Sequence, residues 1–271
     1  MNRIHATAFV DPDAQVASSA EIGPFAVVEA GVIVGENCVI GPHAVLRSGV
    51  ILAEGVGIDA HAVIGGLPQD LRFDPKTISG VRIGANTAIR EGVTIHRATR
   101  AGSFTEIGAN VLIMAYAHVA HDCRVEDRVV LVNNVMLAGH VWVGPYAFLG
   151  GGASFHQNAR IGESAMVSGL TRGPHDVAPF TLVAERCEVH GLNLVGIKRR
   201  GFGQEVISEL KAAYKAVYGQ PGNRRHFAQA MLDGPHSPHS PQARQFLEFF
   251  IQPTKRGYST PVKQLKTEEA P

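Results

Sequence analysis

The sequence is poor in the features that place a protein outside a cell or in a membrane. Only three of its 271 residues are cysteines, and none forms a CxxC pair, which is typical of a chain kept in a reducing compartment. It has no apolar run of about 18 residues, and its first residues, Met1–His5, lack the apolar core of a signal peptide. We therefore expect a cytoplasmic protein without a transmembrane segment.

Charge is also scarce, since Lys, Arg, Asp and Glu make up 18% of the chain and the net charge is +1. The whole molecule thus has no nucleic-acid signature. The charge is unevenly distributed, because residues 188–271 hold 12 basic and 7 acidic residues, a balance of +5, which leaves −4 for the rest. An acidic partner could dock on this last third, although an ordinary solvated helical surface would have the same composition.

What the sequence has in abundance is an aliphatic or other large apolar residue at every sixth position. The first series is Ile4, Val10, Val16, Ile22, Val28, Val34, Ile40, Leu46, Leu52, Ile58 and Ile64. The second series is Ile83, Ile89, Ile95, Ile107, Ile113, Val119, Val125, Leu131, Leu137, Val143, Leu149, Phe155, Ile161 and Val167. A fixed six-residue period of this length predicts a parallel β-helix, in which each unit is a short strand plus a corner and three units form one triangular coil.

A second position of the repeat, four residues after each aliphatic, is small or compact. It includes Ala26, Cys38 and Cys123. Small residues beside large ones fill a narrow interior without voids, so we expect both cysteines to be core residues. A glycine often follows the aliphatic, as at Gly35 and Gly84, and we interpret these glycines as corner residues whose backbone geometry other side chains resist.

The period also predicts how the chain is divided. We expect a β-helix over residues 1–187, interrupted by an external loop at residues 65–80 and by a shorter break at 99–105 that preserves the phase. Insertions in solenoids often build the binding face. Residues 188–271 are predicted to form a C-terminal α-helical domain. Apolar spacing predicts three helices in it, over residues 203–218, 224–232 and 242–251.

Histidines gather at one edge of this predicted prism. With 18 residues taken as one coil, His118, His121, His140 and His156 come next to residues of a single face in three successive coils. Adjacent coils should lie about 4.8 Å apart, so the imidazoles should form a column. Three interpretations are open: a zinc site, a solvated surface, or a general base with neighbours that position a phosphate-bearing substrate.

The pair His121-Asp122 favours the general base, because an adjacent aspartate can fix the tautomer of a histidine and make it a stronger base. The chain has no Gly-x-Ser-x-Gly elbow, which favours direct attack by a substrate hydroxyl on an activated acyl group. The N–H of Gly139, one coil away, is placed to stabilise the resulting oxyanion. The basic run Lys198–Arg200 suits phosphates or carboxylates, or is an ordinary charged connection.

Several stretches together resemble one enzyme family. They are Gly66–Leu71, Thr94–Arg97, Met114–Cys123, Leu137–His140, His156–Gln157 and Gly196–Phe202. Their order and spacing over roughly residues 1–220 are similar to the UDP-N-acetylglucosamine O-acyltransferases, which perform the first step of lipid A synthesis. The resemblance implies a single-stranded left-handed parallel β-helix with a C-terminal α-helical domain, assembled as a homotrimer. It also implies transfer of an (R)-3-hydroxyacyl chain from acyl carrier protein to the 3-hydroxyl of UDP-N-acetylglucosamine, with no cofactor.

Matched residue by residue, the resemblance implies that His121 is the general base, Asp122 its orienting partner and Gly139 the oxyanion donor, with no metal. It also implies a set of contacts with the sugar, the nucleotide, the phosphates or the carrier. These residues are Gln69, Asp70, Arg72, His96, His118, His140, His156, Gln157, Asn193, Arg199 and Arg200. Gly169 matches the position that limits acyl-chain length, and a glycine there favours a longer chain.

The sequence departs from the family pattern at three places. Arg72 stands where the family often has Lys, Val195 where many members have Glu, and Ala184–Cys187 replaces a more usual Gly-Asn stretch. Two alternative functions therefore stay open. One is a related hexapeptide acyltransferase that uses another sugar nucleotide, such as a 3-amino sugar, or an acyl-CoA donor. The other is a zinc-binding or scaffold β-helix without transferase activity.

Overall fold

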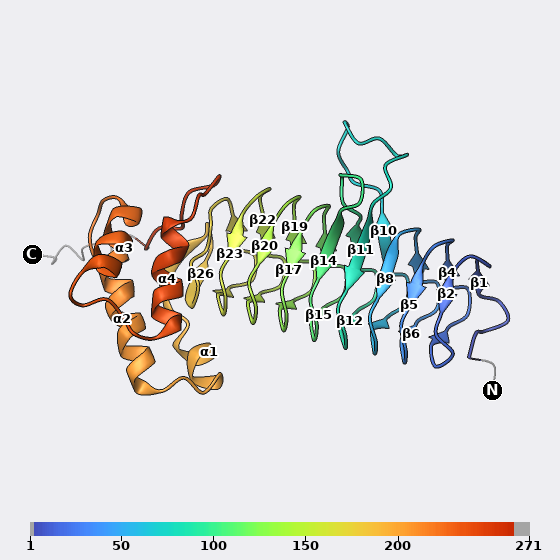
Figure 1. The fold of residues 1–271 in the computed structure, drawn as a ribbon, viewed down its shortest axis with the longest axis horizontal. Coiled ribbons are helices and arrows are strands. Elements are labelled where there is room, and N and C mark those ends of the chain that lie inside the picture. Colours follow the sequence, from blue (N-terminus) through green and yellow to red (C-terminus); the bar gives the residue numbers. More distant parts are fainter. Residues whose placement is uncertain (1–2, 263–271) are drawn as a thin grey trace, which may run out of the picture.

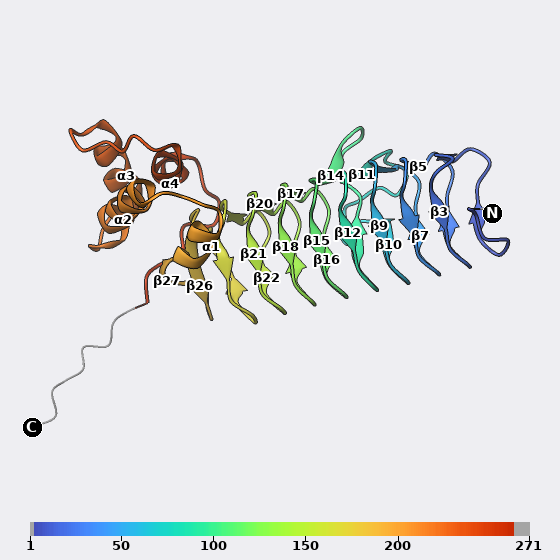
Figure 2. The ribbon, with the colours of Figure 1, turned by 90° about the horizontal axis from the view of Figure 1, so that it is seen from below.

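The computed structural model describes residues 3–262 as a prism of short strands that ends in a group of helices (Figure 1). Successive strands lie on successive faces of the prism. Over most of its length each strand pairs with the strand three places earlier in the chain, so three sheets form. All pairings between named strands are parallel except the last one in the third sheet. The predicted parallel β-helix is confirmed, and Figure 2 shows the same coils from a second side.

Each sheet contains strands from coils along most of the prism. Sheet 1 consists of β1 (Phe9–Val10), β4 (Val27–Val28), β7 (Val45–Leu46), β10 (Val63–Gly66), β13 (Thr94–His96), β16 (His118–Val119), β19 (Met136–Leu137), β22 (Ser154–Phe155) and β25 (Arg172–Gly173). Sheet 2 consists of β2 (Gln15–Val16), β5 (Ile33–Val34), β8 (Val50–Leu52), β11 (Gly80–Ile83), β14 (Phe104–Ile107), β17 (Arg124–Val125), β20 (Trp142–Val143) and β23 (Arg160–Ile161). Sheet 3 consists of β3 (Glu21–Ile22), β6 (Val39–Ile40), β9 (Gly57–Ile58), β12 (Ala88–Ile89), β15 (Leu112–Ile113), β18 (Val130–Leu131), β21 (Phe148–Leu149), β24 (Met166–Val167), β26 (Thr181–Ala184) and β27 (Glu188–Leu192).

The interior of the prism is filled by the two predicted positions of the repeat. Both aliphatic series are buried from Ile22 to Val167, and the compact positions lie between them in the same core. Cys38 and Cys123 are buried there as free thiols, so their prediction as core residues is confirmed.

The explanation offered for the recurrent glycines was wrong. Of the glycines that follow an aliphatic, only Gly65 has a positive φ, and the left-handed corner position is instead taken by residues such as Asn37 two places later. A Cβ on Gly35 would lie 2.7 Å from the carbonyl carbon of Ala53 in the next coil. These positions need glycine because successive coils pack backbone against backbone, not because the corner is left-handed.

The insertion projects from one corner of the prism. Residues 67–79 leave between β10 and β11, at the corner that joins sheet 1 to sheet 2, and form the protruding segment at the top of Figure 1. The shorter break, residues 97–103, leaves from the same corner one coil later, between β13 and β14. Both segments therefore lie on the edge where the histidine column was predicted.

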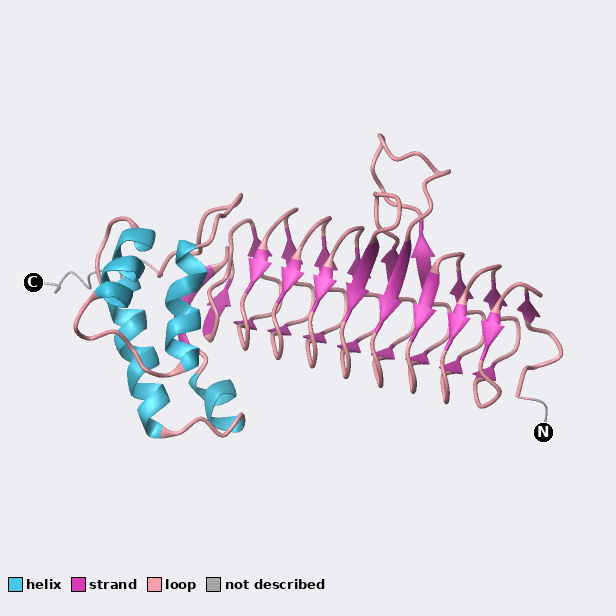
Figure 3. Ribbon diagram, in the orientation of Figure 1, coloured by secondary structure: helices cyan, strands magenta, loops and turns pink. Residues whose placement is uncertain are grey.

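The helical end contains α1 (Leu194–Arg199), α2 (Gln204–Tyr218), α3 (Arg224–Asp233) and α4 (Pro241–Ile251), drawn in cyan in Figure 3. The three predicted helices are confirmed, whereas α1 was missed. Strand β27 lies beyond the predicted boundary at 187/188 and pairs antiparallel with β26, and the division into two domains there stays a prediction. None of the helices in residues 3–262 is both long and apolar enough to cross a membrane.

A buried ion pair in the last coils of the prism also contacts the helical end. Arg160 Nε lies 2.8 Å from Oδ2 of the fully buried Asp176, and the guanidinium of Arg160 stacks on Phe249 of α4. The backbone N–H of Asp176 donates to Gly257 at 2.9 Å, which attaches the segment after α4 to the last coil. The helical end is thus fixed against the prism by polar contacts as well as apolar ones.

Candidate active site

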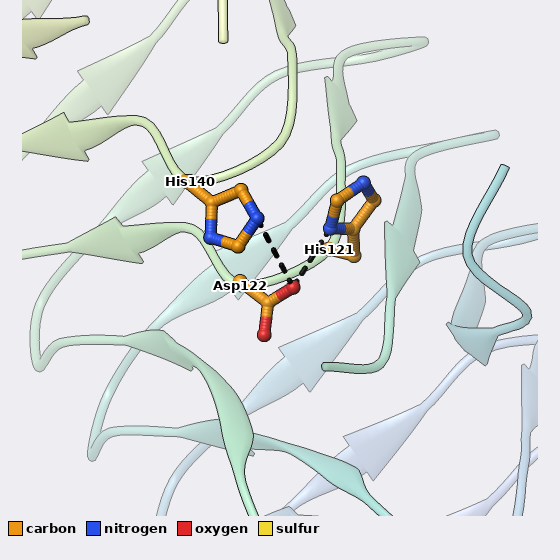
Figure 4. Close-up of side chains that lie close together, drawn as sticks. All are labelled: His121, Asp122 and His140. Atoms are coloured by element: carbon orange, nitrogen blue, oxygen red, sulfur yellow. Dashed lines mark hydrogen bonds and ion pairs between the residues drawn. The ribbon is translucent and has the colours of Figure 1, made fainter. Parts of the chain in front are cut away.

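The predicted histidine column lies at the corner between sheets 1 and 2. Strands β13, β16, β19 and β22 are consecutive neighbours in sheet 1, and His121 and His140 follow β16 and β19 at that corner. Their ring centroids are 5.2 Å apart and the rings are perpendicular. Figure 4 shows both rings beside Asp122. The structure therefore confirms that these histidines share one edge.

The side chain of His121 is buried and its orientation is determined by Asp122. His121 Nδ1 lies 2.8 Å from Asp122 Oδ2, within hydrogen-bond distance. A carboxylate can only accept, so Nδ1 carries the proton and Nε2 is left as the basic nitrogen. This is the tautomer that a general base requires.

Asp122 is itself held by two threonines that the sequence analysis did not identify. Thr99 donates its hydroxyl to Asp122 Oδ2 at 2.7 Å and its backbone N–H to Oδ1 at 3.1 Å. The backbone N–H of Asp122 donates to Thr105 Oγ1 at 2.9 Å. Burial acts to raise the pKa of Asp122, but the hydrogen bonds from His121 and Thr99 outweigh it, so the pKa lies below its usual value. The carboxylate is therefore anionic and immobile.

Gly139 lies directly against the ring of His121. A Cβ at this position would lie 2.7 Å from His121 Nε2 and 3.1 Å from Nδ1, so no other residue fits without moving the imidazole. Within residues 3–262 the backbone N–H of Gly139 donates no hydrogen bond, and the next N–H, that of His140, donates to His121 O at 3.0 Å. The geometry leaves one backbone donor free beside the basic nitrogen.

A second histidine pair lies one coil earlier. The rings of His96 and His118 meet edge to face with centroids 4.6 Å apart, and Thr94 Oγ1 lies 2.7 Å from His118 Nδ1. Burial, with the neighbouring His118 and His121, lowers the pKa of His96 to about 4, and burial also lowers the pKa of His118 and of His140. These rings are neutral at pH 7 and can act as hydrogen-bonding groups rather than as charges.

Two adjoining cavities open at this edge. The smaller, of about 280 Å³, is lined by His118, His121, Gly139, Gln69 and Gln157 among others. The larger, of about 880 Å³, includes His156 and Gln157. The structure thus brings six of the predicted site residues to one edge of the chain, and His96, Asp122 and His140 lie in contact with them.

The other predicted residues line neither of these two cavities. Asp70 and Arg72 form an ion pair of 3.1 Å in the protruding loop. Asn193, Arg199 and Arg200 line a separate cavity of about 430 Å³ beside sheet 3, together with Tyr146 and Val195. That cavity shares no lining residue with the two at the histidine edge, so the structure does not unite these residues with His121 within one chain.

Arg200 and Asn193 are also engaged locally. Arg200 pairs with Glu163, donates to Ser164 Oγ at 2.8 Å and stacks on Tyr146. The side chain of Asn193 caps α1 by accepting from Gly196 N at 3.0 Å. Gly169 lies exposed at the corner between sheets 3 and 1, where a Cβ would be 3.2 Å from Gly151 O.

A metal ion is the other occupant that this geometry allows. His121, Asp122 and His140 each offer a ligand atom, and these atoms lie within 4.8 Å of one another. However, Asp122 Oδ2 accepts a hydrogen bond of 2.8 Å from His121 Nδ1, and the same oxygen lies 3.7 Å from His140 Nε2. Zinc ligands stand about 2 Å from the ion, so the pair would have to separate to admit one.

Comparison with known proteins shows that the chain is similar to acyltransferases. Residues 176–259 match the family model described as Udp N-acetylglucosamine O-acyltransferase, domain 2, and residues 13–48 and 104–139 match the hexapeptide repeats of bacterial transferases. The acyl-(acyl-carrier-protein)–UDP-N-acetylglucosamine O-acyltransferase of Herminiimonas arsenicoxydans is 41% identical over 263 residues, covering 95% of this chain and 99% of that protein. The corresponding enzyme of Campylobacter concisus is 40% identical over 222 residues, covering 81% and 84%.

Solved structures agree with the sequence matches. The UDP-N-acetylglucosamine acyltransferase of Campylobacter jejuni is 34% identical, with a TM-score of 0.87 over 96% of this chain and 100% of that one. The enzyme of Francisella novicida is 32% identical, with a TM-score of 0.89 over 96% and 95%. These matches extend over the prism and the helical end together, and the prism has the left-handed winding implied by the resemblance.

Proposed function

The chain belongs to the UDP-N-acetylglucosamine O-acyltransferase family, and we propose that His121 is the general base of the family's reaction. The protein is an acyltransferase that moves an acyl chain from acyl carrier protein to UDP-N-acetylglucosamine, the first step of lipid A synthesis. The observation that carries the proposed role is the buried His121–Asp122 pair, because it leaves His121 Nε2 as a basic atom beside the cavity, with a carboxylate to stabilise the imidazolium.

The reaction proceeds by direct attack. His121 Nε2 takes the proton of the 3-hydroxyl of the sugar while that oxygen forms a bond to the thioester carbon of the (R)-3-hydroxyacyl donor. The carbonyl oxygen becomes an oxyanion and accepts a hydrogen bond from the N–H of Gly139. Collapse breaks the carbon–sulfur bond, and the departing thiolate takes the proton from the imidazolium. Asp122 stabilises that imidazolium and remains ionised throughout.

The neutral histidines around the base position the sugar. The hydroxyl of Thr94 occupies His118 Nδ1, so His118 Nε2 is available to a ligand in the smaller cavity. Gln69 and Gln157 line the same cavity and add amide donors and acceptors. In this proposal His96, His140 and His156 complete the polar wall, and Asp70 and Arg72 approach the sugar from the protruding loop.

The complete site needs a neighbouring copy of the chain. Asn193, Arg199 and Arg200 face away from His121, so they would reach the nucleotide of a substrate bound to the next prism in a homotrimer. Exposed apolar side chains support such packing along the corner between sheets 3 and 1, where Phe25, Tyr116 and Leu170 are 54%, 68% and 79% exposed. A trimer in solution, measured by light scattering, is the expected result.

The basic helical end and Gly169 concern the acyl donor, and Val195 concerns the nucleotide. The basic helical end would attract the acidic acyl carrier protein in the cytoplasm, an interaction that raises the association rate and weakens with salt. The glycine at position 169 leaves space at the far end of the acyl path and favours a longer chain. Val195 lines the nucleotide-side cavity as an apolar residue, so it contributes no hydrogen bond there.

Mass spectrometry of the product tests the function. The purified protein is given UDP-N-acetylglucosamine and a mixture of 3-hydroxyacyl carrier proteins of different lengths. The expected product is the 3-O-acylated sugar nucleotide, formed without added metal or cofactor. Transfer only to a 3-amino sugar, or only from acyl-CoA, would identify a related acyltransferase instead, and absence of transfer with bound zinc would support a metal-binding β-helix.

A further inference from the structure

The groove at the catalytic edge extends beyond the groups that the proposed reaction uses. The cavities of 280 and 880 Å³ share four lining residues, Ala138, Ser154, Phe155 and Gln157, so they form one continuous depression. One end holds His118 and His121, and the other end is lined by Arg172 and Arg186. Neither arginine has a role in the reaction described above.

The fold holds these two arginines side by side. Arg172 is the outward-facing residue of β25, and its backbone N–H donates to Glu185 O at 2.7 Å, which places the turn that carries Arg186 beside it. Within residues 3–262 neither guanidinium makes an ion pair, whereas Arg124, Arg160 and Arg200 are all paired with carboxylates. Two arginines that line one groove without a carboxylate partner in this part of the chain favour an anionic ligand, because an anion would offset the repulsion between their charges.

We propose that Arg172 and Arg186 bind the phosphate of the phosphopantetheine arm that carries the acyl chain on the donor. The proposal rests on the proposed function, since it takes acyl carrier protein as the donor. It assigns the groove between His121 and the two arginines to the arm itself, which is amide-rich and extended.

The length of the groove selects this phosphate over the diphosphate of the sugar nucleotide. Sheet 1 pairs His118 with Met136, Met136 with Ser154 and Ser154 with Arg172, so Arg172 lies three strands, or about 14 Å, from the catalytic coil. An extended chain advances about 1.2 Å per bond, so the roughly 13 bonds from thioester sulfur to phosphorus span about 16 Å. The roughly five bonds from the sugar 3-hydroxyl oxygen to the nearer phosphorus span only about 6 Å.

Two small donors test the proposal: an acyl-phosphopantetheine and an acyl-pantetheine that lacks the phosphate. In the unaltered protein the phosphate should lower the donor KM about tenfold, since each exposed charge contact contributes a factor of about three. The double variant Arg172→Ala/Arg186→Ala should lose this advantage, while the KM for UDP-N-acetylglucosamine changes less than about twofold. Arg172→Lys/Arg186→Lys should keep most of it, and Arg124→Ala on sheet 2 is the matched control.

Two results would overturn the assignment. The first is a phosphate advantage that persists in the double alanine variant. The second is a raised KM for UDP-N-acetylglucosamine with the donor preference intact, which would show that the arginines bind the nucleotide. Calorimetry with free phosphopantetheine and pantetheine separates this assignment from the proposed function. If the protein transferred no acyl chain but bound phosphopantetheine through both arginines, the enzyme assignment would fail and the site would stand.

Discussion

Two edges of the prism carry columns of histidine, and only one of them has the geometry of a catalytic site. At the corner between sheets 3 and 1, the rings of Phe25, His43 and His61 stack in parallel, with centroids 5.0 and 4.9 Å apart and interplanar angles of 16° and 11°. All three are exposed. At the corner between sheets 1 and 2, the rings of His121 and His140 are perpendicular, buried to different extents, and share Asp122.

The repeat itself explains the difference. His43 and His61 are 18 residues apart and occupy the same position of successive coils, so one ring is nearly a translated copy of the other. His121 and His140 are 19 residues apart and occupy different positions of the corner, as do His96 and His118 on their strands. Equivalent positions give every ring the same surroundings. Catalysis needs one ring with surroundings of its own, which an offset in the repeat provides.

The two edges should differ most in how far kcat falls when one histidine ring is removed. His121→Ala should lower kcat by about 10³-fold, within the range that general-base catalysis contributes. His43→Ala at the other edge should leave kcat unchanged. Both variants should keep the melting temperature of the parent within a few degrees, measured by circular dichroism. Normal turnover by a folded His121→Ala protein would refute the role of His121.

Gly139→Ala should have the next largest effect, because it moves the ring of the proposed base without removing it. The added Cβ would lie 2.7 Å from His121 Nε2, so the imidazole must shift, and a misplacement of about 1 Å costs about 10²-fold in rate. Gly57→Ala is the matched control, since a Cβ there meets no atom within 4 Å. Equal kcat values for the two variants would show that the ring is not held by this contact.

Thr99→Val tests the support of Asp122. The substitution removes the hydroxyl that lies 2.7 Å from Oδ2 and keeps the backbone N–H donor. We expect kcat to fall about tenfold with KM for both substrates unchanged, because the substrate contacts remain while the carboxylate can rotate away from His121. Thr99→Ser should restore most of the rate. If Thr99→Ser were as slow as Thr99→Val, the effect would come from packing and not from the hydrogen bond.

Much of this architecture follows from periodicity, which is readable in the sequence. The six-residue period predicted the prism and its core, and the 18-residue coil placed His121 and His140 on one edge. The pairing of His121 with Asp122 was also predicted, because the two residues are adjacent. Helix α1 was missed because six residues are too few to display a period. The role predicted for the repeat glycines was wrong because contacts between backbones leave no pattern in a single sequence.

The supporting groups of the site could not be predicted in the same way. Thr99 reaches Asp122 from a break in the repeat, 23 residues earlier, where the path of the chain does not follow the period. Thr94 and Thr105 resemble any other strand threonine until their neighbours are known. The separation of Asn193 and Arg200 from His121 depends on which face of the prism each one occupies, and the family resemblance grouped them without that information.

Burial at the corner between sheets 1 and 2 should also make stability depend on pH. The pKa of His96 falls from 6.5 to about 4 on folding, mainly through burial, so between these values the unfolded chain binds a proton that the folded chain does not. Stability should therefore fall as pH decreases from about 6.5 to 4. His96→Asn should flatten this decline in urea midpoints measured across that range, with His43→Asn as the comparison. A decline of unchanged steepness would exclude His96 as a source.

The smallest expected effect belongs to the stacked edge. His61→Ala removes one ring from an exposed stack, and such a contact is worth about 0.5 kcal/mol. Because Phe25, His43 and His61 touch in sequence, His43→Ala should cost slightly more, since it breaks two contacts, and the double variant should cost less than the sum. Urea unfolding measures these differences, and light scattering checks the oligomer. A loss of activity in a His61→Ala protein that still assembles would show that this edge serves the site, and the distinction between offset and equivalent histidines would then no longer separate catalysis from stacking.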